Sequence, residues 1–258
     1  MNLNQWIQIA QKAANDAGKL IMDIYDSGKF EIEIKDNTSP ITRADKRAHE
    51  IITNCLNQTR LPILSEEGMK LNFEKRKSWE YFWLIDPLDG TKEFIHKNGE
   101  FTVNIALIKR NTPLAGVIYR PSTGTLYTGS AEKGIYKTEG KKTIEILPLE
   151  KRKTFNELLG KQGVRIVVSR SHSSAETHSF IARFKEPEVI TMGSSLKFML
   201  LLENKADIYP RFGTTMEWDT AAAHAILNAS NRSVYQTDLS AELTYNKPDL
   251  RNPFFIAF

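Results

Sequence analysis

The sequence predicts an α/β fold of the layered α+β kind, in which helices and sheets are stacked in alternation. Three features support this prediction: a long helical pattern opens the chain, short apolar runs follow residue 80, and strand and helix patterns alternate in the second half. Such alternation is typical of helices that cover the apolar faces of sheets. With 258 residues, 41% of them hydrophobic, the chain can bury a core of its own.

The first elements are predicted from apolar spacing. Residues 3–25 place apolar side chains on a 3.6-residue period and contain no proline, so they predict a long amphipathic helix. A second helical pattern begins near Thr42, where Thr42 and Asp45 have the spacing of a capping box. Between the two helices, residues 30–34 are a strand candidate.

The middle of the chain predicts an antiparallel sheet with hairpins. The apolar runs at 81–86, 101–108, 113–119 and 124–129 are separated by Gly, Pro and Asn. A loop is expected around 139–163. Beyond it, strands are predicted at 164–169 and 188–192, with helices near 175–184, 195–203 and 220–228.

No internal repeat divides the chain, so the simplest organisation is two packed halves that meet at a cleft. We expect an N-terminal α+β half, residues 1–150, that carries most of the candidate metal ligands. Residues 151–258 would form an α/β half that carries the remaining ligand and the substrate-binding residues.

Composition favours a cytoplasmic location. The lone cysteine, Cys55, cannot form an internal disulfide, and its place in a helical pattern predicts a buried thiol. No stretch approaches the roughly 18 apolar residues of a membrane span, and the N-terminus lacks a secretory apolar core.

The net charge of +4 suits a small anionic ligand but is too small to indicate a nucleic-acid-binding tail. Loose attachment to the cytoplasmic face of the inner membrane, and a monomer or a homodimer, are left open.

The most informative segment is 83–91, where an apolar strand runs into Asp86. Pro87 should end the strand ladder, and the pair Asp89 and Gly90 favours a tight turn. Such a turn can bring both carboxylates and the Leu88 carbonyl to one point, and these are the hard oxygen ligands that Mg²⁺ prefers. Taken alone, the segment is better explained as an ordinary Asp-rich turn.

Two further acidic segments support the interpretation as a metal site. Glu66 and Glu67 follow the apolar run 61–64, although adjacent acids in a turn are often merely solvated. Asp219 precedes the predicted helix 220–228, where its carboxylate could instead cap the helix.

At these residues the chain resembles the inositol monophosphatase superfamily of metal-dependent, lithium-sensitive phosphatases. The resemblance covers nearly the whole chain and rests on four segments in order: 39–45, 65–67, 86–94 and 218–222. It implies the alternating α-β-α-β-α sandwich of the inositol monophosphatase and fructose-1,6-bisphosphatase type.

Within that superfamily the chain is similar to the bacterial 3′(2′),5′-bisphosphate nucleotidases. The similarity rests on segments 89–95, 98–108, 169–172, 193–198 and 206–211. It implies a phosphoric monoester hydrolase that converts 3′-phosphoadenosine 5′-phosphate to AMP and phosphate, in sulfate assimilation and nucleotide recycling.

The resemblance also implies roles for individual residues. Two or three Mg²⁺ ions would be held by Glu66, Asp86, the Leu88 carbonyl, Asp89 and Asp219, and a metal-activated water would attack in line. Clustered carboxylates repel one another, so divalent cations would supply the missing charge. Asp45 would polarise Thr91 for catalysis, together with Glu66, although helix capping is a competing role for Asp45.

Further positions are implied to bind the substrate. The backbone N–H groups of Gly90 and Thr91 would hold the reacting phosphate. Lys197 and Arg211 have the charge to pair with a second phosphate. The remaining members of this set are His172, Ser194 and Asp219.

Two alternatives stay open. Another phosphatase of the same superfamily, acting on inositol phosphates or fructose 1,6-bisphosphate, would keep the metal residues without these roles for Lys197 and Arg211. A non-catalytic nucleotide or metal sensor is the alternative from another class. The joint presence of all the acidic residues and Thr91 argues against a sensor.

Overall fold

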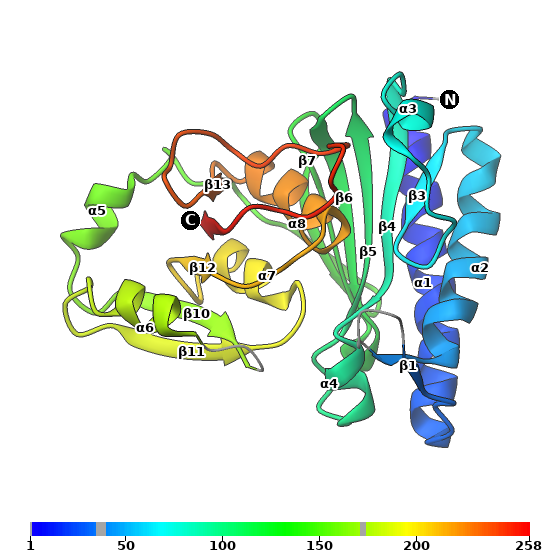
Figure 1. Ribbon diagram of the computed structural model, residues 1–258, viewed down its shortest axis with the longest axis horizontal. Coiled ribbons are helices and arrows are strands. Elements are labelled where there is room, and N and C mark those ends of the chain that lie inside the picture. Colours follow the sequence, from blue (N-terminus) through cyan, green and yellow to red (C-terminus); the bar gives the residue numbers. More distant parts are fainter. Residues whose placement is uncertain (1, 35–39, 171–173) are drawn as a thin grey trace.

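The computed structural model describes residues 2–34, 40–170 and 174–258, and it confirms the layered α+β fold (Figure 1). From one side of the molecule to the other, two long helices are followed by a large sheet, a helical layer, small sheets and two short helices. The three longest helices are α1 (Leu3–Ser27), α2 (Arg43–Leu56) and α8 (Glu217–Ala229). The shorter helices are α3 (Phe73–Arg76), α4 (Thr91–Ile95), α5 (Phe155–Leu159), α6 (Ala175–Ile181) and α7 (Leu196–Leu202), with 3₁₀ turns at Asn57–Thr59 and Pro121–Thr123.

The outer layer consists of α1 and α2, as the apolar spacing predicted. The side chain of Asn2 caps α1 in a capping box with Gln5, and the helix ends at Gly28, whose φ of 68° favours glycine. The predicted capping box of α2 is also present. The alanine-rich face of α1 is buried against α2 and the sheet. Of the strand candidate at 30–34, only β1 (Glu33–Ile34) forms, paired with β2 (Pro40–Ile41).

The large sheet has seven strands in the order β3-β4-β5-β6-β7-β8-β9. Only the β3–β4 pair is parallel; the other pairs are the expected antiparallel neighbours. The strands are β3 (Ile63–Ser65), β4 (Tyr81–Asp89), β5 (Thr102–Lys109), β6 (Thr112–Arg120), β7 (Thr125–Ser130), β8 (Gly134–Glu139) and β9 (Lys142–Glu145). The loop predicted at 139–163 is therefore wrong in part, because β9 and α5 lie within it.

The second face of this sheet is covered by α8, which packs closely enough to exclude side chains. A Cβ atom on Gly116 of β6 would overlap the carbonyl of Ala222, and one on Gly129 of β7 would lie 3.1 Å from the Cα of Ile226. Small residues at both contact points set the separation of helix and sheet. This separation matters for the site, because α8 carries Asp219 in its first turn.

The remaining strands form two small sheets. The parallel pair β10 (Arg165–Ser169) and β11 (Glu188–Met192) lies beside an antiparallel sheet in the order β12-β14-β13. Its strands are β12 (Tyr209–Arg211), β13 (Val234–Gln236) and β14 (Phe255–Ala257). A bridge between Ile166 and Ile208 joins the two sheets, and α5 and α6 share a buried aromatic cluster with them. The division of the chain at residue 150 stays a prediction.

Two findings concern the sequence-based expectations about location. Among the described residues, no helix is long and apolar enough to cross a membrane. Cys55 is free, but it is half-buried on α2 rather than buried as expected. Its position in the apolar pattern predicted the correct helix face, whereas the degree of burial depended on how far the neighbouring elements cover that face.

Candidate active site

The β4 strand carries two acids near its C-terminal end and continues past Pro87, so the expectation that proline stops the ladder was wrong. Asp86 pairs with Asn104 and Asp89 with Thr102, and the register shifts between the two pairs. The irregularity absorbs Pro87, which has no N–H to donate to a ladder. The segment folds back on itself through a hydrogen bond from Leu88 N to Asp86 Oδ1, 3.1 Å long.

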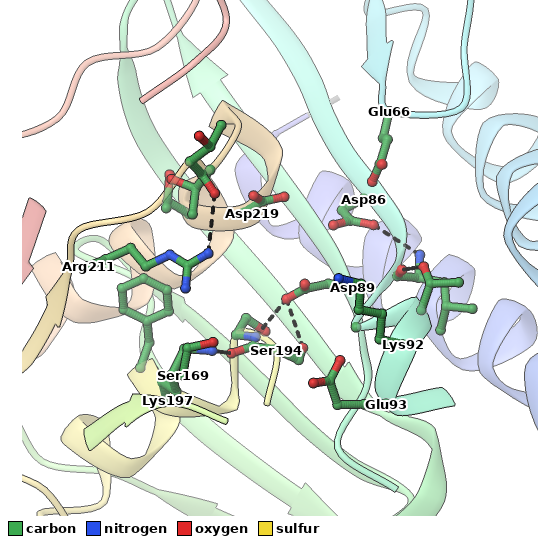
Figure 2. Close-up of a pocket in the computed structure, with 18 of the residues that line it drawn as sticks. Glu66, Asp86, Asp89, Lys92, Glu93, Ser169, Ser194, Lys197, Arg211 and Asp219 are labelled. Atoms are coloured by element: carbon green, nitrogen blue, oxygen red, sulfur yellow. Dashed lines mark hydrogen bonds between the residues drawn. The ribbon is translucent and has the colours of Figure 1, made fainter. Parts of the chain in front are cut away.

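Three of the predicted metal ligands converge. Oxygen atoms of Glu66, Asp86 and Asp219 all lie within 4.8 Å of one another, and Figure 2 shows these side chains pointing toward a common space. They come from the end of β3, from β4 and from the first turn of α8. An all-oxygen set of this kind fits a hard divalent cation. Because positions 66, 86 and 219 are far apart in sequence, only the family resemblance indicated that these side chains lie close together in space.

The predicted helix start at residue 220 placed Asp219 just before α8. In the structure Asp219 lies inside the helix. The helix begins at Glu217, whose fully buried carboxylate accepts a hydrogen bond from the Asn246 N–H at 2.6 Å. Asp219 occupies the third helical position of a capping box with Met216, so the helix begins three residues before the predicted start. Asp219 still accepts the Met216 N–H at 2.9 Å, so it caps the helix and faces the acidic cluster at once.

The cluster is electrostatically unfavourable without a cation. Burial raises the pKa of Asp86 well above its ordinary value, and the nearby charges of Glu66 and Asp89 raise it further. Burial likewise raises the pKa of Asp219, with Asp89 and Glu66 adding to the effect. A bound divalent cation would reverse this tendency, because it favours the charged form of every carboxylate around it.

Asp89 lies beside the cluster and is held mainly by two residues about 105 positions later in the sequence. Its Oδ2 atom accepts hydrogen bonds from Ser195 N at 2.6 Å and Ser194 Oγ at 2.8 Å, with Asn104 Nδ2 at 3.4 Å. Ser195 and Asn104 were missed from the sequence as site residues. Gly193, Ser194 and Ser195, at the start of the predicted helix 195–203, are small and polar residues typical of a turn, and this composition could have indicated Ser195 as a site residue.

Thr91 and Asp45 are in direct contact. The Thr91 hydroxyl lies 3.1 Å from Asp45 Oδ1 and 3.4 Å from the Leu88 carbonyl oxygen. The second oxygen of Asp45 accepts both the N–H and the hydroxyl of Thr42, at 2.7 and 2.6 Å. Helix capping and contact with Thr91 are therefore compatible roles, since each uses a different oxygen. Burial raises the pKa of Asp45, against the opposing effect of the Thr42 hydrogen bonds.

Two cations line the opposite side of the same pocket (Figure 2). The ammonium of Lys197 donates to the Ser194 carbonyl at 2.6 Å and lies 5.3 Å from the centre of the Tyr209 ring. Burial lowers the pKa of Lys197 to about 8. Arg211 donates to the Thr214 carbonyl at 3.3 Å, while its buried Nε has no hydrogen-bond partner among the described residues.

The pocket that joins both groups has a volume of about 290 Å³. Of the predicted site residues, the following line it: Glu66, Asp86, Leu88, Asp89, Gly90, Thr91, Ser194, Lys197, Arg211 and Asp219. Asp45 contacts the pocket through Thr91, and His172 lies outside the described residues. Lining residues that the sequence did not single out include Lys92, Glu93, Tyr209, Thr214 and Phe255.

Comparison with known proteins finds relatives that match most of this chain. The profile of the inositol monophosphatase family matches residues 2–252. The chain is 42% identical to the 3′(2′),5′-bisphosphate nucleotidase CysQ of Escherichia coli K12, over 88% of this chain and 89% of that protein. It is 34% identical to the Haemophilus influenzae protein of the same name, over 98% and 91% of the two chains. The crystal structure of CysQ from Bacteroides thetaiotaomicron, described as a bacterial member of the family, is 44% identical and superposes with a TM-score of 0.83 over 97% and 96% of the chains.

Proposed function

This chain belongs to the inositol monophosphatase family, and we propose that it hydrolyses the 3′-phosphate of 3′-phosphoadenosine 5′-phosphate, giving AMP and phosphate. Relatives that match most of its length are named 3′(2′),5′-bisphosphate nucleotidases. The observation that carries this function is the composition of the pocket, in which an acidic cluster faces Lys197 and Arg211. A substrate with two separate phosphates matches both sides.

We infer that the acidic side holds two or three Mg²⁺ ions through Glu66, Asp86, the Leu88 carbonyl, Asp89 and Asp219. The hard oxygen donors and the raised pKa values of the buried acids support this choice. When bound, Mg²⁺ supplies positive charge that stabilises the phosphate oxygens and makes a nearby water more acidic.

The chain's own residues would prepare the attacking water. Because the Thr91 hydroxyl donates its proton toward Asp45, its lone pairs are free to accept a hydrogen bond from a water in the pocket. Glu66, on the same side, can receive the proton that this water loses. A bond then forms between the water oxygen and phosphorus, the P–O3′ bond breaks, and the 3′-oxygen takes up a proton from solvent water while Glu66 returns its proton to solvent.

On the opposite side, Lys197 and Arg211 would bind the 5′-phosphate, which does not react. The buried Nε of Arg211 lacks a partner among the described residues, and an anion in the pocket would provide one. Ser194 lines the same region, and His172 stays a prediction for nucleotide binding. A cytoplasmic location, consistent with the free thiol of Cys55, is part of the same proposal.

A comparison of substrates tests this function. Phosphate release would be measured with 3′-phosphoadenosine 5′-phosphate, inositol 1-phosphate and fructose 1,6-bisphosphate at equal concentrations. We expect the bisphosphate nucleotide to have the highest kcat/KM. An equal or higher value for inositol 1-phosphate would contradict the assignment and favour an inositol phosphatase.

A further inference from the structure

Glu100 joins three separate segments of the chain near the site. It lies between α4 and β5, and its Oε2 accepts hydrogen bonds from Gly193 N at 2.7 Å and Arg170 Nε at 2.9 Å. Its Oε1 accepts from a terminal nitrogen of Arg170 at 2.6 Å. Arg170 follows the end of β10 and Gly193 follows the end of β11. One carboxylate therefore holds the ends of both parallel strands.

The environment of Glu100 keeps this carboxylate charged. Burial acts to raise the pKa of Glu100, but the hydrogen bonds from Arg170 and Gly193 outweigh it and hold the pKa below its usual range. The side chain of Glu100 is 12% exposed, compared with 44% for Arg170. A two-point contact between a guanidinium and a carboxylate also fixes direction, which a single ion pair does not.

The segment that Glu100 holds is the one that grips Asp89. From Gly193 the chain continues into Ser194 and Ser195, whose hydroxyl and N–H groups donate to Asp89 Oδ2. Ser194 has a φ of 55°, a left-handed conformation that costs a non-glycine residue free energy. Such a conformation persists only where surrounding contacts impose it.

Close packing leaves this arrangement little freedom. A Cβ atom on Gly193 would lie 2.7 Å from Glu93 Cγ and 3.0 Å from the carbonyl oxygen of Glu100. A Cβ atom on Gly90 would lie 3.0 Å from the same carbonyl oxygen. The Glu100 segment thus contacts both the chain after Asp89 and the turn that binds Asp89.

We propose that Glu100, through its contacts with Arg170 and Gly193, is a positioning residue that fixes the turn at residues 193–195 and so sets how Asp89 presents its carboxylate to the metal site. Glu100 does not line the pocket, and it acts on the metal through Asp89 alone. This role depends on one part of the proposed function, namely that Asp89 is a metal ligand.

The test compares Mg²⁺ binding in variants of the full chain. Glu100→Ala removes both contacts, and Glu100→Gln keeps an oxygen for Gly193 N. Arg170→Met removes the ion pair, together with a 3.4 Å hydrogen bond from Arg170 to the Thr191 carbonyl, and leaves the Glu100–Gly193 contact in place. Glu157→Ala is a matched control, since Glu157 also accepts one backbone N–H, that of Thr154, and one cation, Lys151, far from the pocket. Mg²⁺ affinity would be measured by titration calorimetry and as the half-activating concentration, and Tm would be measured in chelator.

We expect Glu100→Ala to weaken Mg²⁺ binding by up to about 10-fold, the low end of the loss when a direct partner of a metal ligand is removed, because Glu100 reaches Asp89 only through Ser194 and Ser195. Saturating Mg²⁺ should restore most of kcat, and Glu100→Gln should lose less affinity than Glu100→Ala. Glu157→Ala should lower Tm and leave Mg²⁺ affinity at the wild-type value.

A lowered Tm with wild-type Mg²⁺ affinity in Glu100→Ala would overturn the positioning role and leave a purely structural one. The same conclusion would follow if Glu157→Ala weakened Mg²⁺ binding as much as Glu100→Ala does. If Glu100→Ala does not fold, wild-type affinity in both Glu100→Gln and Arg170→Met would overturn the role. Lack of Mg²⁺ binding by the wild-type protein would instead contradict the proposed metal site itself.

Discussion

The hydroxyl of Thr91 lies 3.1 Å from Oδ1 of Asp45, although the two residues belong to different helices, α4 and α2. The other oxygen of Asp45 is occupied by Thr42, so the carboxylate cannot turn away from Thr91 without losing two hydrogen bonds. This arrangement aligns the Thr91 hydroxyl before any substrate binds. It gives the most direct test of how the proposed reaction begins.

Thr91→Ala should lower kcat by about 10²- to 10⁴-fold, because it removes the hydroxyl that accepts a hydrogen bond from the attacking water and orients it. Mg²⁺ affinity, measured by calorimetry, should change far less. Thr91→Ser keeps the hydroxyl and should retain most of the activity. Near-normal turnover by Thr91→Ala would exclude the residue from water activation.

Removing metal should abolish turnover by the wild-type protein, and adding Mg²⁺ should restore it. We expect Ca²⁺ to substitute poorly because of its larger and looser coordination shell, and Li⁺ to inhibit by family resemblance. Full activity in chelator, measured as phosphate release, would exclude a metal mechanism.

Asp89→Asn should abolish turnover while leaving Tm in chelator unchanged or raised. The substitution removes one charge from a group of repelling carboxylates and keeps an oxygen that can accept the Ser195 N–H. Thermal unfolding in chelator provides the measurement. A large loss of stability would show that Asp89 serves the fold of the turn.

Lys197→Ala and Arg211→Ala should each reduce kcat/KM for the bisphosphate nucleotide by roughly 30- to 1000-fold, or about 2–4 kcal/mol, because the 5′-phosphate loses its partner in a partly desolvated pocket. Hydrolysis of a phosphomonoester without a second phosphate should change little. Equal losses on both substrates would mean that these residues support the fold or the metal site.

The pH dependence of KM should report the protonation of Lys197. Burial lowers its pKa to about 8, so the cation that binds phosphate is lost as the pH rises through that value. KM for the bisphosphate should therefore rise about tenfold between pH 7 and pH 9. Lys197→Arg keeps its charge over this range and should show a nearly flat KM. A flat profile in the wild-type protein would contradict a binding role for the ammonium.

The properties of this protein that could be predicted from sequence are the local ones. The apolar periods predicted the long helices, most strands of the large sheet and the layered fold, because these patterns depend on residues close in sequence. The acids at 66, 86, 89 and 219 could be singled out by motif, and the resemblance connected them to one site. Turn chemistry around Pro87 was misjudged, since β5 pairs with β4 on both sides of the irregularity.

Tertiary structure alone decided how the Glu217 carboxylate and the Asp89 carboxylate are held. The Glu217 carboxylate accepts the Asn246 N–H, and Gly193 donates to Glu100 across 93 positions of sequence. Neither pairing leaves a periodic or local signal, because a hydrogen bond between distant segments exists only after both have packed into place. The sequence therefore determined the chemical groups of the site, and packing between segments distant in sequence determined their directions.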